Sequence, residues 1–201
     1  HNMRTLSFLK NKEKRLRIAT ETMEIYAPLA ERLGMQRLKQ ELEDLAFTEQ
    51  NPDARESVLR RLEFLQTGGV NLTDRISAEL ESTCEAAGIP VEVSSRIKTP
   101  YSIWSKMQRN HVTFEQLSDT VAFRLIVDTV ADCYQVLGVV HGRYKMVPGR
   151  FKDYISTPKP NGYRSLHTSV LGLADHRVEI QIRTNQMHDI AERGVAAHWS
   201  Y

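Results

Sequence analysis

The stretch RVEIQIR, residues 177–183, alternates charged or polar side chains with branched apolar ones over its whole length. A period of two is typical of a β-strand with one face in a core and the other face polar. The apolar face would carry Val178, Ile180 and Ile182. The polar face would carry Glu179, Gln181 and Arg183.

The preceding stretch, SLHTSV at residues 165–170, alternates in the same way and predicts a neighbouring strand. A turn near Asp175 would join the two strands. His167 would then share the polar face with Glu179, and the two strands would form one polar wall. A polar sheet face that simply meets water is the alternative.

The rest of the second half switches between extended and helical patterns. We expect strands at residues 91–93 and 121–127, the latter rich in β-branched and aromatic residues. Helices are expected over residues 101–109, 130–140 and 184–197. The resulting order predicts an α/β (α+β) fold, in which helices flank a mixed β-sheet.

The first part of the chain has the apolar spacing of helices. Residues 18–33 predict a helix that bends near Pro28 and ends at Gly34, and residues 35–45 predict a second helix. We expect this all-helical segment to present its charged faces to water and to carry no chemistry.

Two further helices are expected after this segment. Asp53 and Glu56 have the spacing of a capping box at the start of one helix. The pair Gly68-Gly69 is the best candidate for a linker, and Thr73 would cap the next helix, which ends at Gly88.

Composition bounds the class of protein. The chain has 201 residues, of which 41% are hydrophobic and 26% are charged, as in a globular domain and unlike a disordered or coiled-coil chain. It has no apolar run long enough to span a membrane and no apolar signal segment near its start. Cys84 and Cys133 stand alone, so we expect free buried thiols in a reducing, cytoplasmic setting.

The net charge of +2 is unevenly distributed. Residues 142–164 hold six basic side chains and one acidic one, Asp153, with tyrosines and a phenylalanine interleaved. Such a segment suggests a polyanionic partner, which would be a nucleotide, an RNA or an acidic protein. A solvated basic loop is the alternative.

Several common site motifs are absent from the sequence. It contains no GxxxxGK[ST], no GxGxxG and no HExxH. His188 and Glu192 have the i, i+4 spacing of metal ligands on a helix, but two such groups alone are weak evidence for a metal site.

Asp119 offers a stronger hypothesis, because it directly precedes the strand at residues 121–127, which also carries Arg124. With Glu179 on a neighbouring strand it could hold Mg²⁺, which prefers carboxylate and phosphate oxygens. The basic segment would neutralise phosphates and Tyr163 could stack on a base. These residues predict a metal-dependent nucleotide site.

A set of longer motifs makes the prediction specific. Their order and spacing resemble the synthetase domain of the RelA/SpoT homologue family over about residues 60–201. The motifs are RIK at 96–98, YSIWSKM at 101–107, RFKDYI at 150–155, PKPNGYRSLHT at 158–168, VEIQIRT at 178–184 and GVAAHW at 194–199.

This resemblance implies a nucleotidyltransferase-like sheet and a reaction. The pyrophosphoryl group of ATP would pass to the 3′-hydroxyl of GDP or GTP, giving AMP and the alarmone (p)ppGpp of the stringent response. Asp119 and Glu179 would be catalytic and hold Mg²⁺, with Glu179 also placed to activate the 3′-hydroxyl. The ATP-binding residues implied are Arg96, Lys98, Ser102, Lys106 and Arg124, the two arginines lying on either side of adenine. The GDP- or GTP-binding residues implied are Lys152, Tyr163 and His167.

Residues 1–60 resemble the end of the family's hydrolase domain and the helices that link it to the synthetase, so residues 61–201 would form the synthetase domain. The RFKD sequence at 150–153 is similar to that of bifunctional members. The chain resembles an excerpt of such a protein, and contacts with a ribosome or a regulator would use regions outside it. We expect ATP and GDP or GTP as partners, and no membrane.

Two other functions stay open on the residues alone. One is a nucleotide- or RNA-binding regulatory module without turnover, although it would have no need of a metal-holding carboxylate pair. The other is an alarmone hydrolase. The sequence lacks the upstream His and His-Asp metal ligands of the family's hydrolase domain, which counts against this function. Formation of AMP and a more phosphorylated guanosine nucleotide from ATP, GDP and Mg²⁺ would distinguish a synthetase from both of these alternatives.

Overall fold

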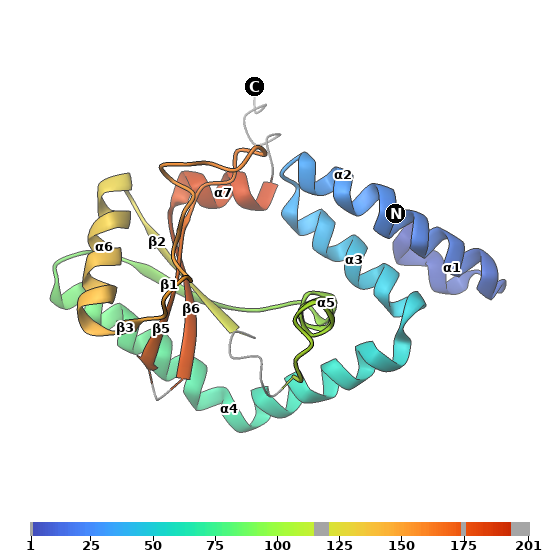
Figure 1. Ribbon diagram of the computed structural model, residues 1–201, viewed down its shortest axis with the longest axis horizontal. Coiled ribbons are helices and arrows are strands. Elements are labelled where there is room, and N and C mark those ends of the chain that lie inside the picture. Colours follow the sequence, from blue (N-terminus) through green and yellow to red (C-terminus); the bar gives the residue numbers. More distant parts are fainter. Residues whose placement is uncertain (1, 115–120, 174–175, 194–201) are drawn as a thin grey trace.

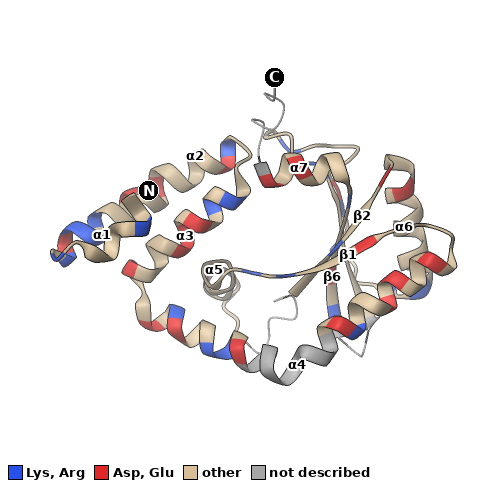
Figure 2. Ribbon diagram, turned by 180° about the vertical axis from the view of Figure 1, so that it is seen from behind, with Lys and Arg blue, Asp and Glu red and all other residues tan. Residues whose placement is uncertain are grey.

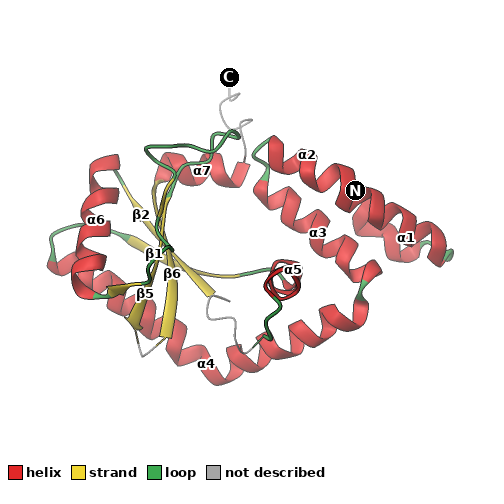
Figure 3. Ribbon diagram, in the orientation of Figure 1, coloured by secondary structure: helices red, strands yellow, loops and turns green. Residues whose placement is uncertain are grey.

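The computed structural model describes residues 2–114, 121–173 and 176–193. Helices precede a mixed sheet that further helices flank, which confirms the predicted fold class (Figures 1 and 3). The helical elements are η1 (Asn2–Phe8), α1 (Lys12–Glu21), η2 (Thr22–Tyr26), α2 (Ala27–Arg32), α3 (Gln36–Gln50), α4 (Pro52–Ala86), α5 (Pro100–Asn110), α6 (Val130–Arg143) and α7 (Asn185–Arg193). The strands are β1 (Glu92–Ile97), β2 (Val121–Val127), β3 (Lys145–Met146), β4 (Lys152–Asp153), β5 (Leu166–Leu173) and β6 (His176–Thr184).

The sheet has the strand order β1-β2-β6-β5-β3, and β4 pairs with β5 beside this path. β2 and β6 run parallel, and the other pairs are antiparallel. The register sets Gln181 of β6 opposite Arg124 of β2 on one side and opposite His167 of β5 on the other. Residues directly opposite one another share a face, so the predicted polar wall forms and extends onto β2.

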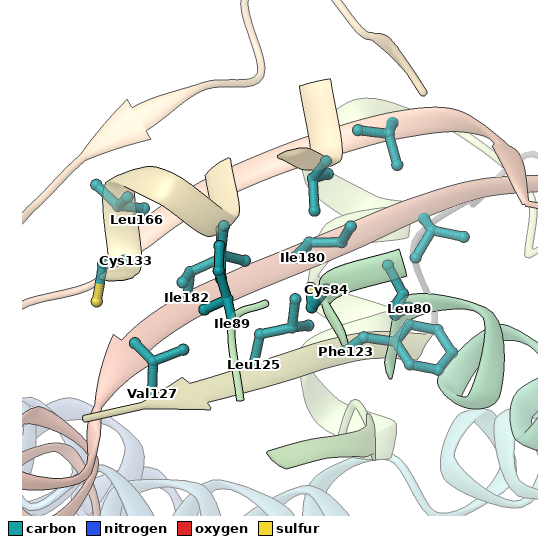
Figure 4. Packing of buried hydrophobic residues seen from close by; sticks show 14 of the residues in the cluster. Leu80, Cys84, Ile89, Phe123, Leu125, Val127, Cys133, Leu166, Ile180 and Ile182 are labelled. Atoms are coloured by element: carbon teal, nitrogen blue, oxygen red, sulfur yellow. The ribbon is translucent and has the colours of Figure 1, made fainter. Parts of the chain in front are cut away.

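The opposite face of the sheet is the main core, which α4 and α6 cover (Figure 1). Figure 4 shows apolar side chains of β2, β5 and β6 packed against residues of these two helices. Ile180 and Ile182 are completely buried there, as their alternation with Glu179 and Gln181 predicts. Cys84 and Cys133 are free and buried in the same core, and burial raises the pKa of each thiol to about 11.

The helix type changes where a bend is predicted near Pro28. The π-helical segment η2 ends where the Ala27 N–H donates to the carbonyl of Thr22, and α2 follows with Pro28 in its first turn. Proline has no N–H to continue the i→i−4 ladder, which fits the change in hydrogen bonding before it. Gly34 ends this region with a positive φ of 73°, where glycine avoids the strain of a side chain.

Helix α4 corrects two predictions. It runs unbroken from Pro52 to Ala86, so the linker at Gly68-Gly69 and the new helix start at Thr73 are both wrong. Each glycine costs a helix about 1 kcal/mol. Packing on both sides offsets that cost: the first half of α4 packs on α5, and its last turns enter the sheet core.

The start of α4 also differs from the prediction. Asn51 precedes the helix without a side-chain cap, and Pro52 occupies its first turn. Asp53 therefore lies inside the helix, and the capping box with Glu56 is wrong. Proline fixes a helical φ at this position, so the helix starts before the acidic residue. The predicted division at residues 60 and 61 falls within α4 and stays a prediction.

Helices α3, α5 and α7 lie on the polar side of the sheet, where α3 packs against both α5 and α7 (Figure 1). Figure 2 shows basic residues at the corner between α2 and α3, beside acidic residues of α7. None of the helices in the described ranges is long and apolar enough to cross a membrane.

Candidate functional site

A cavity of about 570 Å³ opens on the polar face of the sheet. The strands form its floor, α5 forms one wall, and the basic segment at residues 142–164 forms another. Seven of the side chains implied by the family resemblance line it: Arg96, Lys98, Ser102, Lys106, Lys152, His167 and Glu179. Arg124 and Tyr163 line an adjoining cavity of about 180 Å³. Asp119 lies outside the described residues.

Glu179 is the carboxylate on the cavity floor. Its Oε2 lies 2.9 Å from Nζ of Lys98, and its Oε1 accepts a hydrogen bond of 3.1 Å from Nε2 of Gln181. Burial alone would raise the pKa of this carboxyl, but the charge and hydrogen bond of Lys98, together with the hydrogen bond from Gln181, outweigh burial and lower it. Glu179 is therefore ionised at neutral pH, and it borders the cavity.

The opening turn of α5 brings Lys98 and Ser102 to the same wall. Lys98 follows β1, and Thr99 caps α5 by accepting a hydrogen bond from the backbone N–H of Ser102 at 3.3 Å. The hydroxyls of Thr99 and Ser102 are also 2.8 Å apart. Because the helix N-terminus carries partial positive charge, this turn and the nearby lysines make an anion-binding wall.

An aromatic cluster forms the opposite side. The Tyr163 hydroxyl lies 2.7 Å from Nε2 of His167, and the Tyr154 ring meets both side chains edge to face. Nζ of Lys159 lies 5.1 Å from the Tyr163 ring centroid. The turn before Tyr163 has Gly162 at a φ of 76°, so glycine allows the sharp bend that presents the ring.

His167 is neutral in this cluster. Burial lowers its pKa to about 4; Glu179 opposes this shift, and the positive charges of Lys159, Arg183 and Lys152 reinforce it. Burial also raises the pKa of the Tyr163 hydroxyl, which stays protonated. At pH 7 the pair is therefore an uncharged hydrogen-bonded unit able to contact a nucleoside.

The two arginines lie close together at the other end of the polar face. Burial and then the charge of Arg124 lower the pKa of Arg96. Arg96 also donates a hydrogen bond to Oε1 of Gln40 on α3. The helical layer thus reaches the site, which corrects the prediction that residues of the first third only face water.

Sequence patterns missed the contributions of α2 and α3 to the smaller cavity. Glu31, Gln36, Arg37 and Gln40 line it. No signal in the sequence marks them, because the other residues that line this cavity lie more than fifty residues further along the chain. Asn161 shows the same kind of contact, since its amide donates to the Glu31 carbonyl at 3.1 Å.

The weak metal hypothesis for His188 and Glu192 is not supported. No group of three or more possible metal-ligating residues occurs within the described ranges. The pair contacts arginines instead: His188 Nδ1 lies 2.6 Å from Arg183, and Glu192 lies 3.1 Å from Arg124. Two neighbouring guanidinium groups would repel a metal cation.

The mixed sheet and the cationic cavity on its polar face define a domain of the α+β class with a site suited to an anionic ligand. The profile described as "Region found in RelA / SpoT proteins" matches residues 95–201, more than half of the chain. The chain belongs to this RelA/SpoT family.

Comparison with curated proteins agrees. The chain is 54% identical over all 201 residues to the GTP pyrophosphokinase rsh of Brucella ovis, covering 27% of that protein. It is 47% identical over the same length to the bifunctional (p)ppGpp synthase/hydrolase SpoT of Escherichia coli K12, covering 28% of that protein. The chain thus spans about a quarter of these relatives.

Solved structures share the fold. The small alarmone synthetase 1 of Bacillus subtilis, bound to its product pppGpp, matches with a TM-score of 0.52 at 26% identity. The match covers 64% of this chain and 76% of that one. A GTP pyrophosphokinase family protein from Streptococcus pneumoniae matches with a TM-score of 0.51 at 29% identity, covering 65% of this chain and 72% of the other.

Proposed function

We propose that this chain transfers the pyrophosphoryl group of ATP to the 3′-hydroxyl of GDP or GTP, producing AMP and (p)ppGpp. The observation that carries the proposal is the position of Glu179. This carboxylate lies between a cationic wall suited to a triphosphate and an aromatic cluster suited to a guanosine nucleotide. Membership of the RelA/SpoT family supports the same reaction.

ATP would lie along the wall formed by β1 and α5. Lys98, Ser102 and Lys106 would bind its phosphates, because lysines and a helix N-terminus neutralise the charge that spreads over phosphoryl oxygens during transfer. Arg96 and Arg124 would lie on either side of adenine, since guanidinium planes stack on purines and keep their charge.

The acceptor nucleotide would occupy the aromatic side. Tyr163 would stack on guanine, and neutral His167 would contact the nucleotide by a hydrogen bond. Lys152 would bind a phosphate, for it is exposed at the cavity and paired in register with His167. In this arrangement the ribose 3′-hydroxyl would face Glu179.

The proposed transfer makes one bond, breaks one bond and moves one proton, that of the 3′-hydroxyl. The 3′-oxygen forms a bond to the β-phosphorus of ATP, the bond between that phosphorus and the α,β-bridging oxygen breaks, and AMP leaves. A ribose hydroxyl is a poor nucleophile, so Glu179 takes its proton as general base. If Lys98 turned to the ATP phosphates, the Glu179 carboxylate would be released from its ion pair and could meet the hydroxyl.

The donor set also fits Mg²⁺. Glu179 is ionised and borders the cavity, and Mg²⁺ in nucleotide sites is commonly held by one or two carboxylates together with phosphate oxygens. Glu179 and Asp119 would hold the ion, which would neutralise charge on the transferring group. The Glu179 carboxylate would both hold the ion and accept the hydroxyl proton.

The direct test is an assay of the purified chain with ATP, GDP and Mg²⁺. We expect AMP and ppGpp in equal amounts, detected by anion-exchange chromatography. A chain that binds both nucleotides but forms neither product would be a binding module, and the proposed reaction would be wrong. With GTP in place of GDP the expected product is pppGpp, and comparison of the two rates measures the preference between the acceptors.

A further inference from the structure

One cluster on the polar face joins Arg124 to three residues that have no part in the proposed reaction. It consists of Arg183 on β6, His188 and Glu192 on α7, and Arg124 on β2. The Glu192 carboxylate lies 3.1 Å from Nη1 of Arg124 and 3.6 Å from Nη2 of Arg183. One carboxylate of α7 therefore joins the guanidinium groups of two parallel neighbouring strands.

The guanidinium groups of Arg124 and Arg183 are buried, so they need the negative charge of Glu192. Arg183 is 1% exposed, and the side chain of Arg124 is 11% exposed. Charged groups that are removed from water need a partner of opposite charge. Loss of Glu192 would leave two arginines facing each other without their shared anion.

His188 completes the arrangement on the other side of Arg183. Its Nδ1 lies 2.6 Å from Nη2 of Arg183. Arginine does not give up its proton in proteins, so Nδ1 of His188 is the acceptor and its proton is on Nε2. A histidine in this state adds no positive charge, which leaves Glu192 to balance both guanidinium groups.

We propose that Glu192 is a positioning residue for ATP: it fixes the Arg124 guanidinium so that one planar face stays directed at the adenine ring. This inference rests on the proposed function, which assigns Arg124 to adenine. A guanidinium that donates through its edge to a carboxylate keeps its faces available for stacking. The aromatic guanosine side lies on β5 and its preceding turn, and within the described residues no hydrogen bond or ion pair joins it to Glu192.

The test compares the affinities of a non-transferable ATP analogue and of GDP, measured by calorimetry. In Glu192→Gln, which keeps the side-chain shape, we expect roughly tenfold weaker binding of the analogue, and GDP affinity within about twofold of wild type. The matched control is Asp189→Asn on the same helix, an exposed acid whose loss should change neither affinity. In an Arg124→Ala background, Glu192→Gln should add less than about a twofold effect, because its action passes through Arg124.

Glu192→Asp keeps the charge and should bind the analogue more tightly than Glu192→Gln. All titrations are made below the melting temperature of the least stable variant. Unchanged analogue affinity in Glu192→Gln, equal weakening of both nucleotides, or a full effect in the Arg124→Ala background would each overturn the positioning role. If wild type binds both nucleotides yet makes no (p)ppGpp, the proposed function fails while the binding comparison still decides the role of Glu192.

Discussion

Nζ of Lys98 lies 2.9 Å from Oε2 of Glu179, across the gap between the end of β1 and the middle of β6. This ion pair holds the carboxylate ionised in spite of its burial. It also joins the proposed phosphate-binding wall to the proposed base. Lys98 can pair at short range with either the Glu179 carboxylate or an ATP phosphate, so phosphate binding would release Glu179 from this ion pair.

Glu179→Gln should nearly abolish (p)ppGpp synthesis. The amide keeps the size of the side chain but cannot accept the 3′-hydroxyl proton, and a positioned base alone is typically worth about 10²–10⁴ in rate. Because Ile180 and Ile182 hold the strand in the core from its other face, the melting temperature should stay near that of wild type. Turnover above about a tenth of wild type would contradict the base role.

Lys98→Met should change the sign of the contribution that ionised Glu179 makes to the free energy of unfolding at neutral pH. In wild type the folded-state pKa of Glu179 lies below the ordinary value, so its ionisation stabilises the fold above about pH 4.3 and this stabilisation is lost as the pH falls. Without Lys98, burial is the dominant influence and the folded-state pKa rises. The ionised carboxylate then destabilises the fold at neutral pH.

The measurement is urea unfolding of both proteins between pH 7 and pH 4. We expect Lys98→Met to be less stable at pH 7 and to approach wild type as the pH falls. Lys145→Met on β3, which replaces an exposed lysine outside the cavity, should show no such convergence. A constant difference across this pH range would contradict the link between Lys98 and the Glu179 pKa.

Much of the sheet could be predicted because its strands are long enough to show a period. The run at residues 121–127 and the alternation at 177–183 each give several independent positions, and both strands form there. β3 and β4 have two residues each, so no period exists to detect. The continuity of α4 through Gly68-Gly69 depends on packing at both of its ends, and local propensity cannot show that.

The site was predictable to the extent that alternation and motifs place residues on one face. Glu179 and His167 were expected on a shared polar wall, and the strand register places their side chains on one face. The contact between Gln40 and Arg96 joins residues of two elements that are far apart along the chain, and no pattern in either segment indicates the other. Such contacts arise from how the helical layer packs on the sheet.

His167 should titrate far below an ordinary histidine. Its folded-state pKa of about 4, against about 6.5 for an unfolded histidine, means that the unfolded chain binds more protons between these values. This contribution to stability is therefore complete above pH 6.5 and is lost as the pH falls toward 4, by up to about 3 kcal/mol. His167→Gln should show a flatter fall in unfolding free energy over this range.

NMR titration of histidine-labelled protein, with His167→Gln to assign the signal, measures the pKa directly. A His167 signal that titrates near pH 6.5 would contradict the neutral, buried state.

Tyr163→Ala should weaken guanosine nucleotide binding far more than ATP binding. Loss of base stacking on an aromatic ring costs about 1–3 kcal/mol, which corresponds to roughly five- to 150-fold in the KM for GDP. Tyr163→Phe keeps the ring but removes the hydroxyl that contacts His167, so it should retain most of the GDP affinity. Equal weakening of ATP and GDP by the alanine variant would place Tyr163 outside the acceptor site.

Gln40→Ala should tighten ATP binding. In this structure the Gln40 side chain lines both cavities and accepts a hydrogen bond from Arg96, so it would compete with adenine for the space beside the guanidinium. Hydrogen bonds to charged groups contribute about 1.5–3 kcal/mol, part of which solvation of the freed groups returns. We therefore expect the KM for ATP to fall by about two- to tenfold, with the KM for GDP unchanged. Thr48→Ala changes an exposed residue on the same helix, whose hydroxyl donates to the Asp44 carbonyl, and it controls for general effects on α3. A raised KM for ATP in Gln40→Ala would mean that Gln40 supports Arg96 in its nucleotide-binding position instead of competing with the nucleotide for it.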